Sequence, residues 1–146
     1  MTDKIYFDMD GTIADLYADP NWLPKLRAYD PTPYTNARPL VNMSRLARLL
    51  HKAQRNGYTI GIISWLSKNP NPAYDQAVTL AKLEWLARHL PSVKWDEIHI
   101  VAYGTPKSTV ADTIGGILFD DEEQNRAEWG GMAYRPEQIF DLLADL

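Results

Sequence analysis

Short apolar runs that alternate with helical patterns are the feature that most constrains this fold. Each run is rich in β-branched or aromatic residues and is bounded by Gly, Pro or polar residues. The runs cover residues 4–7, 58–64, 98–102, 117–119 and 132–134. Segments with apolar residues at helical spacing lie between them, and such alternation predicts a parallel sheet with helices on both faces. We therefore expect an α/β domain with a five-stranded, mainly parallel sheet.

The longest helical pattern covers about residues 74–90. The apolar residues at helical spacing in it are Leu80, Leu83, Leu86, Ala87 and Leu90. A helix of a globular protein normally turns such a stripe toward the core. We therefore expect a helix over these residues, and we interpret Trp85 on it as a packing residue.

Length, charge and composition exclude several classes of protein. The 146 residues are the usual length of one domain, and we treat residues 1–146 as one. The absence of cysteine excludes a disulfide scaffold, thiolate metal sites and a cysteine nucleophile. No apolar run approaches the ~18–20 residues of a membrane span, and no signal peptide is apparent, so we expect a cytoplasmic protein without a membrane partner. The formal net charge of −4 argues against a stable nucleic-acid partner.

Residues 17–40 differ from the rest of the chain. Five of the ten prolines lie in this segment, together with several aromatic residues. Proline interrupts helices and restricts the residue before it, so we expect only short helical turns and extended pieces here. We interpret the segment as an excursion from the main body of the domain.

Polar residues gather where the predicted strands end. They are Asp8 and Asp10 after the first run, Ser64 at the end of the second, Lys107 near the third, and Asp120 and Asp121 after the fourth. In open parallel sheets, ligands bind outside the carboxyl ends of the strands. We therefore expect four carboxylates, a hydroxyl and an ammonium group to converge on one edge of the sheet.

Four carboxylates at one place require a cation, because unpaired charges in a partly dry cleft repel one another strongly. A set of oxygen ligands without histidine or cysteine favours a hard ion, and we expect Mg²⁺. The candidate metal ligands are Asp8, Asp10, Asp120 and Asp121.

Such a cluster is suited to phosphoryl transfer. Asp8 would attack phosphorus and form an aspartyl-phosphate, while Asp10, on the same side of an extended chain, would act as general acid and base. Gly11 would let backbone amides approach the phosphate, and Ser64 and Lys107 would bind its non-bridging oxygens. Asp-x-Asp-Gly alone is also typical of turns and calcium loops, so this prediction depends on the whole ordered set.

The ordered set resembles the four motifs of the haloacid dehalogenase-like (HAD) phosphohydrolases. The matching residues are DMDGT at 8–12, Ser64 after an apolar run, Lys107, and ILFDD at 117–121. Within that superfamily the chain is most similar to the 5′(3′)-deoxyribonucleotidases, on the segments DMDGTIADL, KLEWLARHLP and EIHIVAYGTPKSTVADTIGGILFDD. The resemblance implies a Rossmann-like fold, Mg²⁺ dependence and hydrolysis of nucleoside monophosphates.

The resemblance also implies a role for each residue. Asp8 becomes the nucleophile and a metal ligand, and Asp10 the acid and base whose backbone carbonyl also binds the metal. Asp121, with Asp120 beside it, supplies the last carboxylate, and the phosphate binders are those named above. Residues 17–40 become a minimal cap, much shorter than the helical cap of those nucleotidases.

Two other residues depart from the family pattern. Trp65 follows Ser64 where a second small hydroxyl residue is common, and Glu122 follows the acidic pair where an arginine is common. For Glu122 and Glu123 we favour a solvated acidic turn or helix start.

Aromatic residues near the predicted site are candidates for substrate binding, because nucleobases stack on aromatic faces. They are Trp65, Trp22 and Tyr34. Packing against the body of the domain is the competing interpretation for each of them.

We expect a small phosphorylated metabolite as the partner, and a nucleotide in particular. The alternatives are a phosphorylated sugar, a nucleic-acid 3′-phosphate end, or a non-catalytic phosphate-binding module. A basic groove beside the site would favour nucleic-acid ends, whereas an aromatic slot would favour mononucleotides. The sequence leaves the oligomeric state open, a dimer included.

Overall fold

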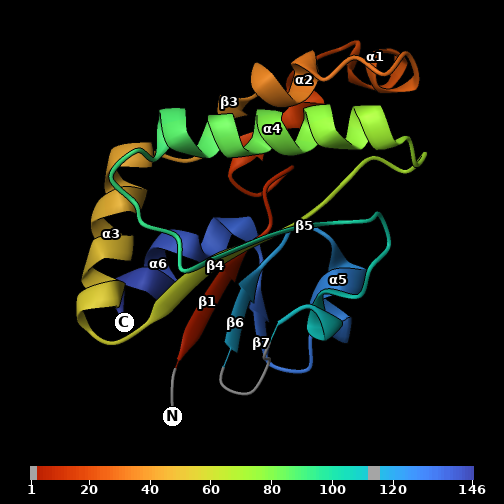
Figure 1. Cartoon of the computed structure of the whole chain (residues 1–146). Helices are drawn as coiled ribbons and strands as arrows, with labels where there is room; N and C mark the ends of the chain where they lie inside the picture. Colours follow the sequence, from red (N-terminus) through yellow and green to blue (C-terminus); the bar gives the residue numbers. More distant parts are fainter. Residues whose placement is uncertain (1–2, 112–115) are drawn as a thin grey trace.

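The computed structural model describes residues 3–111 and 116–146 and contains a central five-stranded sheet (Figure 1). Its strands are β1 (Lys4–Phe7), β4 (Thr59–Trp65), β5 (Glu97–Val101), β6 (Gly116–Phe119) and β7 (Met132–Tyr134). They lie in the order β5-β4-β1-β6-β7, and every neighbouring pair is parallel. The predicted α/β fold is confirmed, with β1 at the centre of the sheet.

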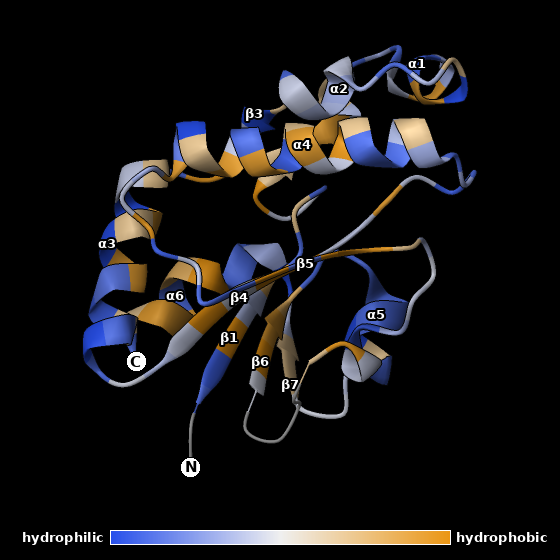
Figure 2. Ribbon diagram, in the orientation of Figure 1, coloured by the Kyte–Doolittle hydropathy of each residue, from blue (hydrophilic) through white to orange (hydrophobic). Residues whose placement is uncertain are grey.

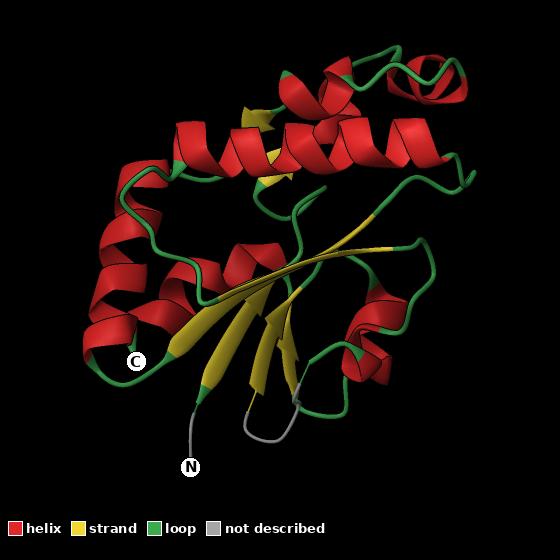
Figure 3. Ribbon diagram, viewed as in Figure 1, coloured by secondary structure: helices red, strands yellow, loops and turns green. Residues whose placement is uncertain are grey.

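Helices cover both faces of the sheet, as predicted (Figures 1 and 3). The helix α3 (Met43–Arg55) and the helix α6 (Ile139–Ala144) lie against one face, and α5 (Glu123–Glu128) lies on the other. The long helix α4 (Pro72–His89) crosses above the carboxyl edge of the strands. Two short 3-10 helices, η2 (Lys107–Thr109) and η3 (Pro136–Gln138), complete the main body. Within the described ranges, no helix combines the length and the apolar character that crossing a membrane requires.

The main core lies between the sheet and the helices α3, α4 and α6. Ile5 and Phe7 of β1 point into it and are fully buried, with the matching isoleucines of β4 beside them. Tyr6 points to the opposite face, where it packs with Leu118 and Trp129 next to α5. Because side chains on both faces are covered, the central strands are apolar almost throughout.

The helix α4 packs with a different face from the one that its leucines predict. The predicted helix is confirmed, but Leu80 is 59% exposed, Leu83 is 38% exposed and Ala87 is exposed too, so the spacing of these three does not mark the buried face. Of the five apolar residues at helical spacing, Leu86 and Leu90 are buried. Figure 2 shows apolar and hydrophilic residues interleaved along this helix, and no one side of it is much more apolar than the rest, so spacing alone does not select the buried face. The fully buried Trp85, whose indole N–H donates to a backbone carbonyl at 2.7 Å, marks the face that does.

Residues 17–40 contain only short elements, as the prolines predict. They are η1 (Leu16–Ala18), α1 (Trp22–Arg27), α2 (Thr32–Thr35) and β3 (Arg38–Pro39), the last paired antiparallel with β2 (Ala14–Asp15). This segment lies against the outer side of α4 (Figure 1). Tyr34 of α2 is buried in a small apolar cluster with Tyr74 and Val78 of α4. The excursion is therefore anchored to the body through α4.

Candidate active site

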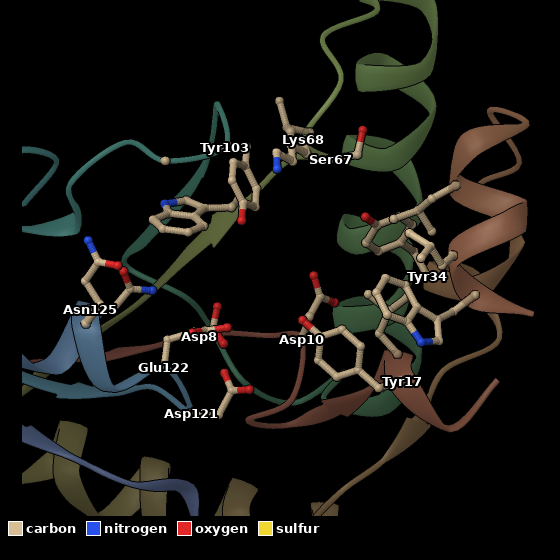
Figure 4. A pocket seen from close by; sticks show the side chains of 18 of the residues that line it. Asp8, Asp10, Tyr17, Tyr34, Ser67, Lys68, Tyr103, Asp121, Glu122 and Asn125 are labelled. Carbon is tan, nitrogen blue, oxygen red and sulfur yellow. The ribbon is translucent and has the colours of Figure 1, made fainter. Parts of the chain in front are cut away.

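The predicted polar residues do converge at the carboxyl edge of the sheet. The strands β4, β1 and β6 are neighbours, so Ser64, Asp8 and Asp120 lie at the ends of adjacent strands. A cleft of about 700 Å³ opens beside them, and Asp8, Asp10 and Asp121 line it (Figure 4). Ser64 and Asp120 are fully buried behind its surface.

Lys107 binds two of the carboxylates. Its ammonium group donates to Asp8 at 2.8 Å and to Asp120 at 2.7 Å, and all three residues are buried. Burial disfavours the charged ammonium, but the two carboxylates outweigh that effect and raise the pKa of Lys107 above its ordinary value. The lysine therefore stays positively charged at the point where β1 and β6 end.

Thr12 fixes the other oxygen of Asp8. Its hydroxyl donates to the Asp8 carboxylate at 2.9 Å and accepts from the backbone N–H of Asp121 at 3.2 Å. Thr12 is itself fully buried. One oxygen of Asp8 thus faces Lys107 and the other faces Thr12, so the carboxylate has a defined orientation. Thr12 belongs to the DMDGT motif, but its side-chain role was not predicted from the sequence.

Gly11 is required by the turn that carries Asp10. Its φ of +83° lies in the left-handed region that favours glycine, and a Cβ there would overlap the carboxylate of Asp121. The amides that follow, of Thr12, Ile13 and Ala14, all donate to the carbonyl of Met9 and close the turn tightly. The glycine therefore allows the first and last acidic motifs to come into contact.

Lys82 is a site residue that sequence reasoning missed. It projects from α4, is 1% exposed, and donates to Asp10 at 2.9 Å, to the hydroxyl of Ser64 and to the carbonyl of Trp65 at 2.7 Å. Because the Ser64 oxygen accepts from an ammonium group, its own O–H points away from Lys82. The ring of Tyr34 lies 5.0 Å from the same ammonium group, on the side of the excursion.

A sequence signal for Lys82 exists in retrospect. It lies four residues after Val78 and three before Trp85, and both of these are buried on α4. A lysine at a core position of a helix is rare unless it is paired. The neighbouring leucines of α4 masked this signal, because they define a competing stripe.

The carboxylates fit a divalent cation. Asp8, Asp120 and Asp121 each offer an oxygen, and these atoms lie within 4.8 Å of one another. Among the described residues, no group hydrogen-bonds the buried Oδ1 of Asp121. Burial, followed by the negative charge of Asp8, raises the pKa of Asp121 to about 8, and burial also raises the pKa of Asp120. A cation at this position would relieve both effects.

Asp10 lies apart from these three side chains. Its carboxylate bonds to Lys82, and burial is the largest cause of its raised pKa, which Lys82 opposes and Asp8 reinforces. Asp10 nevertheless lines the cleft beside Asp8 (Figure 4). This arrangement separates Asp10, which can carry a proton, from the three candidate metal ligands.

Aromatic side chains form two walls of the cleft (Figure 4). Tyr17, Trp22 and Tyr34 line it on the side of the excursion. Trp65 and Tyr103 line it on the side of β4 and β5, with ring centroids 5.0 Å apart. The three predicted substrate-binding aromatics therefore border the cleft, and Tyr17 and Tyr103 join them.

Trp65 is held in place from two directions. Its indole N–H donates to the carbonyl of Thr105 at 2.8 Å, and its ring lies 5.6 Å from the ammonium group of Lys107. Trp65 therefore lies over the ammonium group of Lys107.

Comparisons with protein-family models and with curated proteins find no match to this chain. Solved structures do match. A D,D-heptose 1,7-bisphosphate phosphatase from Burkholderia thailandensis is 12% identical, with a TM-score of 0.55 over 99% of this chain and 97% of that one. A protein from Mesorhizobium loti, described as a HAD-like phosphatase, is 16% identical, with a TM-score of 0.56 over 98% of this chain and 85% of that one. At these identities the likeness shows the fold: this chain has the Rossmann-like α/β fold of HAD-like phosphatases.

Proposed function

We propose that this protein is a Mg²⁺-dependent phosphomonoester hydrolase that acts through an aspartyl-phosphate on Asp8. The observation that carries the proposal is the environment of Asp8. It lies at the end of the central strand, its two oxygens are oriented by Lys107 and Thr12, and it borders a cleft of about 700 Å³. The fold shared with HAD-like phosphatases supports the same interpretation.

The first step forms a bond between a carboxylate oxygen of Asp8 and the phosphorus atom of the substrate. The bond from phosphorus to the leaving oxygen breaks, and that oxygen takes a proton from Asp10. Burial, which raises the pKa of Asp10, favours the protonated form that this step requires. Ser64 and Lys107 would bind the non-bridging oxygens as negative charge shifts among them.

The second step returns the enzyme to its starting state. Asp10, now deprotonated, takes a proton from a water molecule whose oxygen attacks phosphorus. The bond between phosphorus and Asp8 breaks, and inorganic phosphate leaves. Asp8, Asp120 and Asp121, with the backbone carbonyl of Asp10, would hold Mg²⁺, which supplies positive charge toward the phosphate oxygens. The chain's own cations alone would not offset both these carboxylates and a phosphate.

We propose a nucleoside 5′- or 3′-monophosphate as the substrate. The cleft has the size of a small-molecule site, and aromatic rings line two sides of it, as stacking of a base requires. Lys68 is the only basic residue that lines it within the described part of the chain. A basic groove for a nucleic-acid end is thus not found there. Residues 17–40 would act as a minimal cap, because they supply one aromatic wall.

A sugar monophosphate is the second candidate. The carboxylates of Glu122 and Glu128 line the cleft and can accept hydrogen bonds from sugar hydroxyls. A sugar bisphosphate is the substrate that the name of the Burkholderia thailandensis phosphatase gives for that protein.

Phosphate release from a panel of nucleoside and sugar monophosphates tests the proposal. We expect release in Mg²⁺, none with a chelator, and a loss of at least ~10³-fold in Asp8→Asn with the fold retained by circular dichroism. Wild-type protein that releases no phosphate from any monoester would overturn the enzyme proposal. Binding of phosphate without release would indicate the non-catalytic module.

A further inference from the structure

The cleft outside the reacting groups carries more negative than positive charge. Glu122 and Glu128 line it on the side of α5, and both are exposed to solvent. Lys68 is the single cation among the described lining residues, and it too is exposed; Figure 4 shows it across the cleft from Glu122. A ligand that extends from Asp8 into the cleft therefore meets the carboxylates of Glu122 and Glu128, which together we call the acidic wall.

Three cations beside the reacting groups are already engaged. Lys107 is bonded to two carboxylates, and Lys82 donates its three protons to Asp10, Ser64 and Trp65. Arg126 of α5 donates to the carbonyl of Asp120 at 2.9 Å and does not line the cleft. None of these groups can turn toward a second anion without breaking a buried contact.

Hydrogen bonds hold the acidic wall in place. The backbone N–H of Glu122 donates to Asp120 at 2.9 Å, which fixes the start of α5 beside the reaction centre. Glu128 accepts from Gln124, another lining residue, at 3.2 Å. Burial and the nearby aspartates raise the pKa of Tyr17, which lines the cleft, and the negative charge of Glu122 adds to this effect.

We propose that Glu122 and Glu128 are specificity-determining residues that restrict this cleft to substrates with a single phosphate group. The proposal rests on the proposed phosphatase function and concerns the same cleft. A second phosphate carries about −1.5 to −2 charges at neutral pH. At about 8 Å in a water-filled cleft at low salt, each glutamate would weaken its binding about fourfold to sixfold. The inferred preference is opposite to the one named for the Burkholderia thailandensis phosphatase, although the two proteins share a fold.

Matched pairs of probes test this selection. The pairs are adenosine 5′-monophosphate with adenosine 3′,5′-bisphosphate, and fructose 6-phosphate with fructose 1,6-bisphosphate. We expect wild-type kcat/KM to favour the monophosphate by about tenfold or more in at least the better-used pair, and less at high salt. Glu122→Gln combined with Glu128→Gln should raise the bisphosphate-to-monophosphate ratio by about tenfold or more.

Glu123→Gln is the matched control, because Glu123 is exposed on the same helix but does not line the cleft. It should leave the ratio unchanged. The proposal is wrong if wild-type protein uses both members of a pair equally, if the double variant keeps the wild-type ratio, or if Glu123→Gln shifts the ratio as far.

A binding measurement separates this proposal from the proposed function. Calorimetry with Asp8→Asn in Mg²⁺ gives the dissociation constants of the same four probes without turnover. If wild-type protein hydrolyses no monoester, the phosphatase proposal fails, but the ratio of dissociation constants still decides the charge selection. Equal affinity for both members of each pair would overturn it.

Discussion

Replacing Lys82 by methionine tests how the buried lysine supports the site. The change keeps the length of the side chain and removes the charge that bonds to Asp10, Ser64 and the Trp65 carbonyl. Removing one partner of a buried ion pair costs about 3–5 kcal/mol, because the other charge is left uncompensated. The side chain of Asp10 is 16% exposed and can recover some hydration, so we expect the lower end of that range. For a chain of this length, about 3 kcal/mol lowers the unfolding midpoint by about 10 °C.

Lys25 provides a control with the same chemistry and the same geometry. Lys25 and Asp19 also form a lysine–aspartate pair at 2.9 Å, but the Lys25 side chain is 38% exposed whereas that of Lys82 is 1% exposed. Exposed pairs contribute little to stability, so Lys25→Met should lower the midpoint far less. Thermal unfolding followed by circular dichroism measures both variants. Equal effects of the two substitutions would refute the argument from burial.

The coupling between Lys82 and Asp10 is measured by a double-mutant cycle. Because Lys82→Met and Asp10→Asn remove the same interaction, together they should cost about 1–3 kcal/mol less than the sum of their separate effects. Urea denaturation gives the four free energies of unfolding that the cycle requires, those of wild type, the two single variants and the double variant. Additive effects would show that the two side chains do not stabilise each other.

Three further outcomes are expected. Gly11→Ala should destabilise the protein by more than about 1 kcal/mol and abolish phosphate release. The control Gly57→Ala, also at a positive φ (+95°) but with open space around it, should keep the activity. Similar losses of activity in both variants would exclude the overlap with Asp121 as the cause. Burial raises the pKa of Asp121 from its ordinary 3.8 to about 8, so between these pH values the folded metal-free protein binds more protons than the unfolded chain. Its stability should therefore fall as pH rises through this range, and Mg²⁺ should restore it. An Asp121→Asn variant whose unfolding midpoint has the same pH dependence as wild type would contradict this. Asp10→Asn should lower kcat at least ~10²-fold with the fold intact, and unchanged turnover would remove Asp10 from the mechanism.

Local patterns in the sequence predict the strands and the convergence of the acidic motifs. The apolar run of residues 58–64 is typical of a strand covered on both faces. In the sheet, the observed strand order brings the ends of β1, β4 and β6 together. Asp8 and Asp120 directly follow β1 and β6, and Ser64 is the last residue but one of β4, so their proximity needs no knowledge of side-chain packing. The positive φ of Gly11 is predictable for a similar reason, because it belongs to the backbone of one turn, whereas the contact of Gly11 with Asp121 is not.

Contacts between distant elements were decided only by the tertiary structure. More than one face of α4 is apolar enough to be buried. The face with Trp85 is the one that packs against the body, and as a result Leu80 and Leu83 are exposed to solvent. The same packing places Lys82 next to Asp10. Glu122 shows the same limit, because its sequence context indicates a solvated turn and only the arrangement of α5 places it beside the cleft. Sequence periodicity specifies which residues share a side of an element. Which side packs against another element depends on contacts between distant parts of the chain. The ion pairs of Lys82 with Asp10 and of Lys107 with Asp8 join residues 72 and 99 positions apart, and such pairs form only in the folded protein.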